Sequence, residues 1–391
     1  MSSYAIEFDY SGYLSIGAGK VSHDLAKFDD YDDSISFGND SVFGFQLDTK
    51  FNEKFEFAGQ IVARGYSQDG YDEFEPQLEW AFVSYRFAPA WSVRVGRLRT
   101  PYYLITDYKE VGYAYPWVRP NVDAYNSILA FLNNYDGMEL LYNSKLAGFD
   151  FSAQLVAGSY EKLNYSTRVI ADSTAGIILT IGTEHLTLRL NHSESVIDLQ
   201  VEGSDQLVSA FETIGIAYPS FAAISHTGLI DNEPYIYDSV GVLFDRDGWL
   251  VHSEFYTIET THPTAQNFQA AYLSIAYQFE TLTPYAMIGS YKAFGGGPMQ
   301  SLLETTYTEL PPGVNAFIDD VRGQVVSATT TNQKDLSLAV GLRWDFFDNM
   351  ALKFEVLEIK PQGGTWGVLS GSSSITPKDT YVYSAVFDLI F

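Results

Sequence analysis

The sequence predicts an all-β chain that forms a closed antiparallel transmembrane β-barrel of about sixteen strands, with short periplasmic turns and long extracellular loops. Three observations support this fold class. Apolar and polar residues alternate along most of the chain, short and long connections alternate between the strand segments, and aromatic residues make up 16% of the sequence. Tyr and Phe suit pleated surfaces and membrane interfaces. We therefore expect a single barrel domain over residues 1–391.

The alternation with period two is clearest near the C-terminus. The odd-numbered residues from Tyr381 to Phe391 are all apolar or aromatic, whereas the even-numbered ones include Ser384 and Asp388. In 335–347 the even-numbered residues are apolar, and the odd-numbered ones include Arg343. This is the pattern of a strand with one apolar face and one polar face.

Applied to the whole chain, this pattern predicts about sixteen strand segments. They cover residues 4–17, 35–50, 54–66, 77–88, 90–98, 135–145, 149–160, 167–181, 184–195, 235–245, 249–259, 268–279, 283–292, 335–347, 349–359 and 378–391.

The connections between these segments differ in length in a regular way. Tight turns are predicted at Asn52-Glu53, Ala88-Pro89, Ala147-Gly148, Arg246-Asp247-Gly248 and Asp348-Asn349. Long links are predicted at 18–34, 99–134, 196–234, 293–334 and 360–377. In an up-and-down barrel every second connection lies on the same side, so this alternation predicts short turns on one side and long loops on the other.

A sixteen-stranded barrel encloses a lumen that side chains cannot fill. The apolar face should therefore point outward into lipid and the polar face into water. We expect lipid contact for Leu338, Val340, Leu342, Phe387 and Leu389. We expect lumen water at Arg343, Asp345, Ser384 and Asp388. Aromatic residues near strand ends, which suit the rims of a membrane barrel, are Trp91, Trp249, Trp344, Tyr381 and Phe391.

Composition excludes several partners. The net charge of −26 argues against nucleic acid, which needs patches of Lys and Arg. The chain has no cysteine, so it holds neither disulfides nor thiolate metal sites. No cofactor or metal motif is found. Asp29, Asp30, Asp32 and Asp33 have carboxylate spacing that suits calcium, but they lack the glycine turn and the terminal Glu of a calcium loop, so we favour a solvated acidic loop.

Two segments carry a resemblance to a known family. One is the terminal strand Tyr381–Phe391, which ends in an aromatic residue. The other is Val93–Tyr125, which contains Val95-Gly96-Arg97-Leu98-Arg99-Thr100-Pro101 and Val111-Gly112-Tyr113-Ala114-Tyr115-Pro116-Trp117. Together they resemble the Gram-negative outer-membrane porins, in particular those of gammaproteobacteria.

That resemblance implies a homotrimer in the cell outer membrane, in contact with membrane lipid and lipopolysaccharide. It implies passive diffusion of ions and small hydrophilic solutes, and a third outer loop, here 99–134, folded inward as a constriction. The loop departs from a uniformly acidic pattern because it mixes Asp107, Glu110 and Asp123 with Lys109 and Arg119.

Alternation places several arginines on the wall before this loop. Arg64, Arg86 and Arg94 should face the lumen, whereas Arg97 and Arg99 have the opposite parity to Arg94. They join the same wall only where the strand ends or bulges at Gly96. The predicted pore constriction therefore consists of Arg64, Arg86, Arg94, Arg97, Arg99, Asp107, Glu110, Arg119 and Asp123. We expect its opposed charges to act on passing solutes, with a weak preference for cations. An alternative is that the arginines only pair with neighbouring acids to hold the loop.

Two other functions remain open. A substrate-selective channel for anionic or sugar solutes would use lumenal arginines such as Arg86 and Arg343, or the rings of Trp80 and Phe82. A barrel enzyme would need a Ser–His pair, and His192-Ser193 and His252-Ser253 are adjacent in sequence, so they point to opposite faces of a strand. We therefore expect no enzyme activity.

Overall fold

The structure is a computed structural model that describes residues 6–66, 72–125, 133–164, 167–201, 209, 212–217, 230–262, 265–295, 313–316, 333–371 and 375–391. Its sixteen barrel strands are β1 (Glu7–Val21), β3 (Val42–Lys50), β4 (Phe55–Arg64), β5 (Gln77–Ala88), β6 (Trp91–Arg99), β7 (Asn134–Leu146), β8 (Phe149–Asn164), β9 (Thr167–Gly182), β10 (Leu186–Val201), β11 (Ile230–Arg246), β12 (Trp249–Thr260), β13 (Gln266–Tyr277), β14 (Leu282–Gly295), β15 (Lys334–Phe347), β16 (Met350–Pro361) and β18 (Thr380–Ile390).

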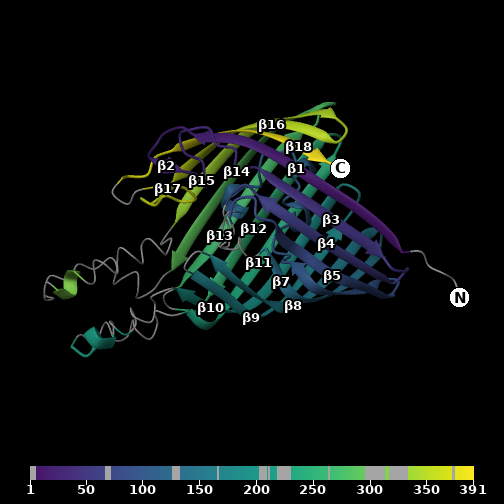
Figure 1. The fold of residues 1–391 in the computed structure, drawn as a ribbon, viewed down its shortest axis with the longest axis horizontal. Coiled ribbons are helices and arrows are strands. Elements are labelled where there is room, and N and C mark those ends of the chain that lie inside the picture. Colours follow the sequence, from purple (N-terminus) through teal and green to yellow (C-terminus); the bar gives the residue numbers. More distant parts are fainter. Residues whose placement is uncertain are drawn as a thin grey trace.

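These strands form one closed antiparallel barrel, in which each strand pairs with its neighbours in sequence and β1 pairs with β18 (Figure 1). The closing register runs from Tyr13 opposite Ile390 to Val21 opposite Val382. Backbone hydrogen bonds between Gly12 and Phe391 extend it at the short-turn end. The predicted fold class, a closed antiparallel barrel, is confirmed.

Each predicted segment corresponds to one barrel strand, but the second was predicted too long. It was expected over 35–50, whereas β3 begins at Val42. Residues 22–41 instead form a loop at the long-loop end, where Ser36 bridges to Gly19 of β1. In this loop β2 (Ala26–Lys27) pairs with β17 (Ser370–Gly371), a two-stranded sheet that the sequence did not predict. The apolar residues Ile35 and Phe37 mimic the start of a strand.

The short turns follow from local sequence. Ala147-Gly148 and Asp247-Gly248 both have two consecutive residues with positive φ, at 52° and 89° and at 52° and 83°. Such a pair is the two-residue turn that matches the twist of antiparallel strands, and glycine adopts its second position without strain. The predicted links 196–234 and 293–334 lie largely outside the described residues, as do residues 4–5 of the first predicted strand.

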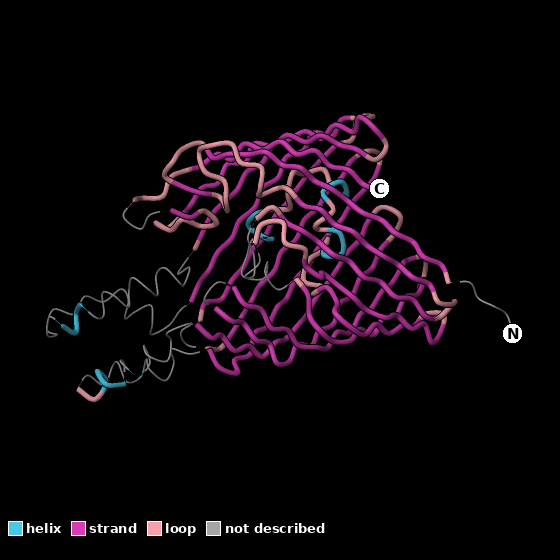
Figure 2. The backbone as a smooth tube through the Cα atoms, in the orientation of Figure 1, coloured by secondary structure: helices cyan, strands magenta, loops and turns pink. Residues whose placement is uncertain are grey.

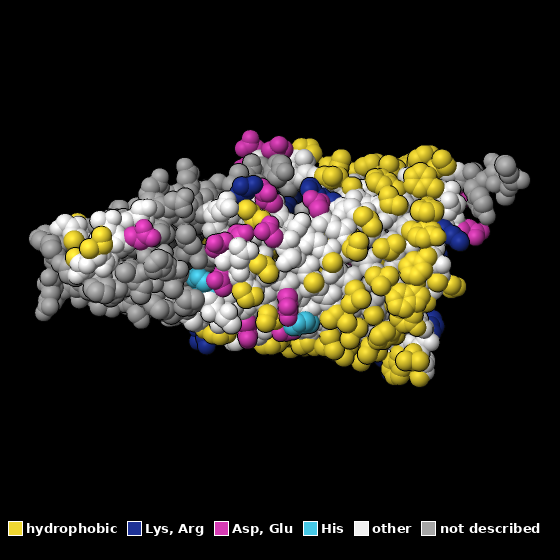
Figure 3. Space-filling view, turned by 90° about the horizontal axis from the view of Figure 1, so that it is seen from below, with side chains coloured by type: hydrophobic (Ala, Val, Ile, Leu, Met, Phe, Trp, Pro, Cys, Tyr) yellow, Lys and Arg dark blue, Asp and Glu magenta, His cyan; other side chains and the backbone are white. Residues whose placement is uncertain are grey.

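The outer wall is apolar toward the short-turn end (Figure 3). Val340 and Leu342 are exposed there, as the alternation predicts. An aromatic rim runs near the short turns, with ring contacts from strand to strand through Phe55, Tyr85, Phe87, Trp91, Tyr142 and Phe151. Trp249, Trp344, Tyr381 and Phe391 are exposed as well. A band of this kind with an aromatic rim is the surface of a barrel that lies in a bilayer.

None of the helices within the described ranges is long and apolar enough to cross a membrane. The helical turns between β6 and β7 lie inside the barrel (Figure 2). Arg343, Ser384 and Asp388 point inward as predicted, but they do not face open lumen water. Arg343 and Ser384 hydrogen-bond to that segment, and Asp388 is buried against Lys353 and Ser15.

Candidate functional site

The segment between β6 and β7 carries the main interior structure. We call its described part, residues 100–125, the inner loop. It contains two short 3-10 helices, η1 (Thr106–Tyr108) and η2 (Gly112–Ala114), and the single-turn helix α1 (Val122–Tyr125). Ile105, Trp117 and Asp123 are fully buried. Residues 126–132 of the predicted loop lie outside the described residues.

A buried charge network holds the first part of the inner loop. Arg99 donates to the Thr106 carbonyl oxygen at 2.8 Å and to Glu79 at 2.7 Å. Arg64 on β4 donates to Glu79 at 2.7 Å and to Glu110 at 2.9 Å. Burial alone would raise the pKa of Glu110, but the charges of Arg64 and Lys109 lower it overall. Burial lowers the pKa of Lys109 to about 8.

The next residues of the inner loop hydrogen-bond to β10, β11 and β12. Arg189 and Asn191 both donate to the Pro101 carbonyl, at 3.0 and 2.9 Å. The Tyr237 hydroxyl donates to the Tyr102 carbonyl at 2.6 Å. The Leu104 amide donates to Glu254 at 2.7 Å. Backbone groups of a segment without regular structure thus find partners on the barrel wall, as buried polar groups require.

The last part of the inner loop lies against β15, β16 and β18. Arg119 contacts Asp40 at 2.5 Å, Glu355 at 3.0 Å and Ser384 at 2.5 Å. Asp123 accepts a hydrogen bond from Ser337, and its carboxyl lies beside that of Asp335. Burial raises the pKa of Asp123.

A cavity of about 970 Å³ remains on the opposite side of the lumen, toward the short turns. It is lined by residues of β1 and β3 to β10 together with Pro101 and Asp107 of the inner loop. On its wall, Arg94 of β6 reaches its strand partner Glu139 of β7 at 3.4 Å and lies 5.1 Å from the Phe82 ring centre. Its acidic residues without an ion pair among the described residues are Glu7, Asp9, Asp48, Glu56 and Asp107. The cavity is therefore polar, water-accessible and predominantly acidic.

The structure separates the predicted constriction residues into groups. Arg64, Arg99 and Glu110 meet in the buried network, while Arg94 and Asp107 line the cavity. Arg119 and Asp123 lie on the other side of the lumen, against β15 to β18. Arg86 is exposed near the short turn after β5, away from the inner loop.

Arg97 is placed differently from the prediction. It is on the outer wall, where it pairs with Asp136 at 2.9 Å beside the exposed Val95 and Met138. The reason is that β6 pairs with β7 without a register shift from Trp91 to Arg99, so no bulge at Gly96 turns Arg97 inward. Of the two arginines with this parity, Arg99 lies at the end of β6 and points into the interior, whereas Arg97 does not.

Sequence reasoning missed several interior residues. Glu79 is the extra residue at a register shift between β4 and β5, which reverses the parity expected from Ser84. Lys353 and Glu355 do follow the alternation of β16, and that signal was present in the sequence. Asp40 lies in the loop after β1, where alternation gives no guidance.

The remaining candidate clusters are the acidic loop and the adjacent His–Ser pairs. Among the described residues, no group of three His, Asp or Glu side chains is arranged to hold a metal ion. In the acidic loop, Asp32 accepts hydrogen bonds from Ser34. His192 is exposed beside Asp238, whereas Ser193 is buried and donates to Asn191.

Three solved structures have a similar barrel. An anion-selective porin from Comamonas acidovorans matches with a TM-score of 0.59 and 10% identity, over 99% of this chain and 100% of that one. Salmonella typhi OmpF, in complex with daunomycin, matches with a TM-score of 0.55 and 12% identity, over 98% and 97%. A trimer form of OmpT, an outer membrane protein of Vibrio cholerae, matches with a TM-score of 0.52 and 9% identity, over 99% and 100%.

No family model matches the chain, and no curated protein matches it. At 9–12% identity the structural matches establish the fold, and they agree with a location in the outer membrane. The chain is a closed sixteen-stranded barrel of the kind found in Gram-negative porins.

Proposed function

We propose that this chain is an outer-membrane porin, a water-filled channel for passive diffusion of ions and small hydrophilic solutes. One observation carries the proposal: the barrel wall is apolar outside, while its interior holds a polar cavity of about 970 Å³ beside an inward-folded segment. In this proposal the region 99–134 is the constriction loop, and Arg94, Arg99 and Asp107 border the aqueous side of the constriction.

Planar-bilayer recording of the purified protein tests this function. We expect stepwise conductance that scales with salt concentration, and swelling of proteoliposomes in small sugars. Absence of steps from folded, inserted protein would contradict the proposal. Hydrolysis of lipid or peptide substrates by the same preparation would point to an enzyme instead.

A substrate-selective channel is the second candidate. Arg94 and Arg189 line the cavity together with Trp80 and Phe82, which offers cations and aromatic faces to an anionic or sugar solute. Selective transport would appear as a saturable block of ion current by micromolar to millimolar solute. A current that stays proportional to free salt in the presence of many sugars and anions would favour general diffusion.

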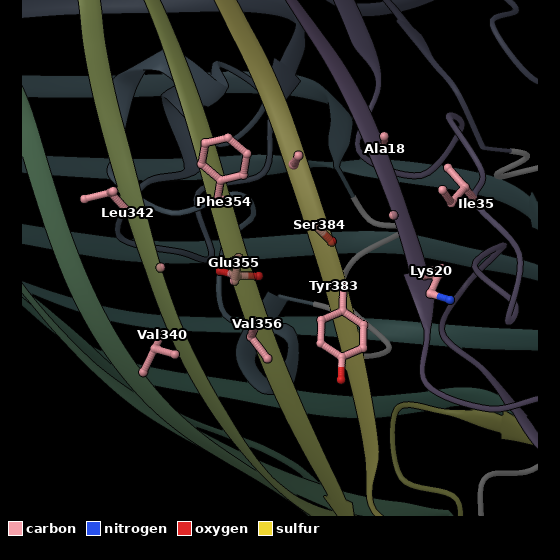
Figure 4. A pocket seen from close by; sticks show the side chains of 13 residues that line it. Ala18, Lys20, Ile35, Val340, Leu342, Phe354, Glu355, Val356, Tyr383 and Ser384 are labelled. Atoms are coloured by element: carbon pink, nitrogen blue, oxygen red, sulfur yellow. The ribbon is translucent and has the colours of Figure 1, made fainter.

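We also propose a homotrimer whose contact face includes the closing seam. A groove of about 740 Å³ lies on the outer wall there, between the side chains of Phe354, Val356, Tyr383 and Ile35 (Figure 4). Ile35 and Phe37 belong to the loop after β1 and are 68% and 63% exposed, so the loop adds apolar surface beside that of the barrel strands. Native mass measurement in mild detergent tests the trimer, and Ile35→Asp with Phe37→Asp should shift it toward monomer.

Lipid contact is proposed for the rest of the outer wall. Lys20, Lys292, Lys334 and Lys360 occupy outward positions at the long-loop ends of β1, β14, β15 and β16. Cations at this rim suit the phosphates of lipopolysaccharide. Replacing all four with Gln should reduce copurifying lipopolysaccharide without changing the conductance.

A further inference from the structure

Two inward-facing cations lie side by side on the wall that the inner loop covers. Arg343 of β15 and Lys353 of β16 are direct partners in the strand register. Like charges at opposite positions of neighbouring strands repel. Lys353 is fully buried, and the Arg343 side chain is 12% exposed. Their placement therefore requires strong acceptors nearby.

The inner loop supplies those acceptors from its backbone. Lys353 donates to the carbonyl oxygens of Gly112 at 2.5 Å and Trp117 at 2.7 Å. Arg343 donates to those of Tyr113 at 2.6 Å and Tyr115 at 3.0 Å. Four carbonyls within six residues thus bind two wall cations, and hydrogen bonds from charged donors are the stronger kind.

The remaining faces of both cations are also occupied. Lys353 pairs with Asp388 at 2.9 Å, and its ammonium lies 4.8 Å from the Tyr115 ring centre. Arg343 pairs with Asp345 at 2.7 Å and lies 4.5 Å from the Tyr113 ring centre. Each cation is held by one wall carboxylate and one aromatic ring of the inner loop, which adds cation–π attraction to the hydrogen bonds.

The fit leaves little room around the loop. A Cβ atom added to Gly112 would lie 2.4 Å from an oxygen of Asp388 and 2.8 Å from the hydroxyl of Ser15. The Tyr113 hydroxyl donates to the Asp348 carbonyl in the turn between β15 and β16, at 2.7 Å. Residues 112–117 therefore reach down to the short-turn end of the barrel, and they fill the lumen beside β15, β16, β18 and β1.

We propose that Lys353 and Arg343 act as a latch that holds residues 112–117 against this wall and so sets the open cross-section of the channel. The proposal rests on the channel function proposed above. Lys353 and Arg343 are positioning residues, because they act through the loop backbone. When the latch is removed, residues 112–117 leave the wall and the filled side of the lumen opens to water.

Single-channel conductance tests the latch in two variants. Lys353→Met combined with Asp388→Asn removes one cation without leaving its partner charge buried, and Arg343→Gln removes the other. We expect conductance to rise about twofold in each, because the lumen cross-section limits the current. Lys353→Arg in the parent chain keeps a cation and its donors, so this variant should have a conductance close to the parent value. Lys145→Met is the matched control, since the Lys145 side chain is 84% exposed at a short turn.

Thiol labelling gives a second readout that does not depend on current. The chain has no cysteine, and Val118 is buried, so Val118→Cys introduces a single protected thiol beside the latched segment. We expect slow labelling by a maleimide in the parent barrel and labelling at least about tenfold faster in the latch variants, because local opening exposes the site.

The outcomes separate the two proposals. Unchanged labelling and unchanged conductance in variants of a conducting parent would overturn the latch and leave the channel standing. Faster labelling with unchanged conductance would show that the latch does not set the cross-section, which also overturns it. A parent protein that does not conduct would overturn the channel function. It would also overturn the latch, because there would be no current for the latch to set. Should the doubly substituted variant fail to refold, Arg343→Gln decides by the same two readouts.

Discussion

The two sides of the lumen at the short-turn end are built from the same alternation of inward polar residues, yet they differ in content. On the side of β15 to β18, Arg343 pairs with Asp345, Lys353 pairs with Asp388, and both cations donate to the inner loop. On the side of β3 to β10, Asp48 and Glu56 line an open cavity without ion pairs among the described residues. Inward polarity alone thus does not mean contact with water. What decides is whether a segment of the chain supplies complementary backbone groups.

The largest expected difference between the two sides concerns substitution of one inward-facing serine on each side. Ser384 lies in the filled side, 2.5 Å from Arg119, whereas Ser152 lines the open cavity. Ser384→Arg places an unpaired charge against Arg119, and we expect it to lower the free energy of unfolding by on the order of 3 kcal/mol. Ser152→Arg should cost less than about 0.5 kcal/mol. Urea unfolding in lipid vesicles measures both, and equal losses would contradict the distinction.

Asp123, which attaches α1 to β15 through Ser337, should make the filled side of the lumen sensitive to pH. Asp123 faces Asp335, Ser337 and Asn121, and burial raises the pKa of Asp123. The folded state therefore holds this proton more tightly than the unfolded state. The stabilisation that this proton gives is fully present at pH values below the ordinary carboxyl pKa. It is lost as pH rises through the raised pKa of Asp123.

Current noise and brief closures should accordingly increase with pH, since an ionised and buried Asp123 carboxylate loosens α1. Recording between pH 5 and pH 9 measures this. Asp123→Asn should flatten the pH dependence, and Asp136→Asn on the outer wall is the control. A parent channel equally noisy at both ends of the range would argue against this role of Asp123.

The acidic residues of the open side should set the ion preference. Asp9, Asp48 and Glu56 line the cavity, and we expect a modest preference for cations. Asp48→Asn with Glu56→Gln should move the reversal potential toward anions. The shift should be larger at 0.1 M than at 1 M salt, because the screening length falls from about 10 Å to about 3 Å. A shift that does not depend on salt would indicate an indirect change in pore shape.

The smallest effect is expected for the outer-wall pair. Arg97→Gln removes an exposed ion pair with Asp136, which is worth at most about 1 kcal/mol, and it should leave the reversal potential unchanged. Arg94→Gln, at an inward position of the same strand, should shift that potential toward cations. Equal shifts from both variants would place Arg97 in the lumen and contradict the register.

The register of the wall was predictable from sequence because one face of each strand lies in lipid. A slip of the strand register by one residue would put Arg343 in the bilayer. The alternation around Val340 and Leu342 is therefore compatible with one register. The interior was not predictable in the same way. Glu79 depends on a bulge, Arg99 on where β6 ends, and the contacts of Arg119 on a loop residue, Asp40, far away in sequence. Alternation gives the direction of a side chain, but pairing inside the barrel depends on the path of the inner loop.

The seam between β1 and β18 has a consequence for how the molecule is made. Ser15 and Asp388, which hydrogen-bond across it, are separated by 373 residues. Contacts between such distant parts form late, since their loop-closure entropy is large. Until they form, the growing sheet has two open edges and an apolar face, a combination prone to aggregation. We expect chain closure to be the slow step of biogenesis, and holdase chaperones or a lipid surface to protect the unclosed sheet until its ends meet.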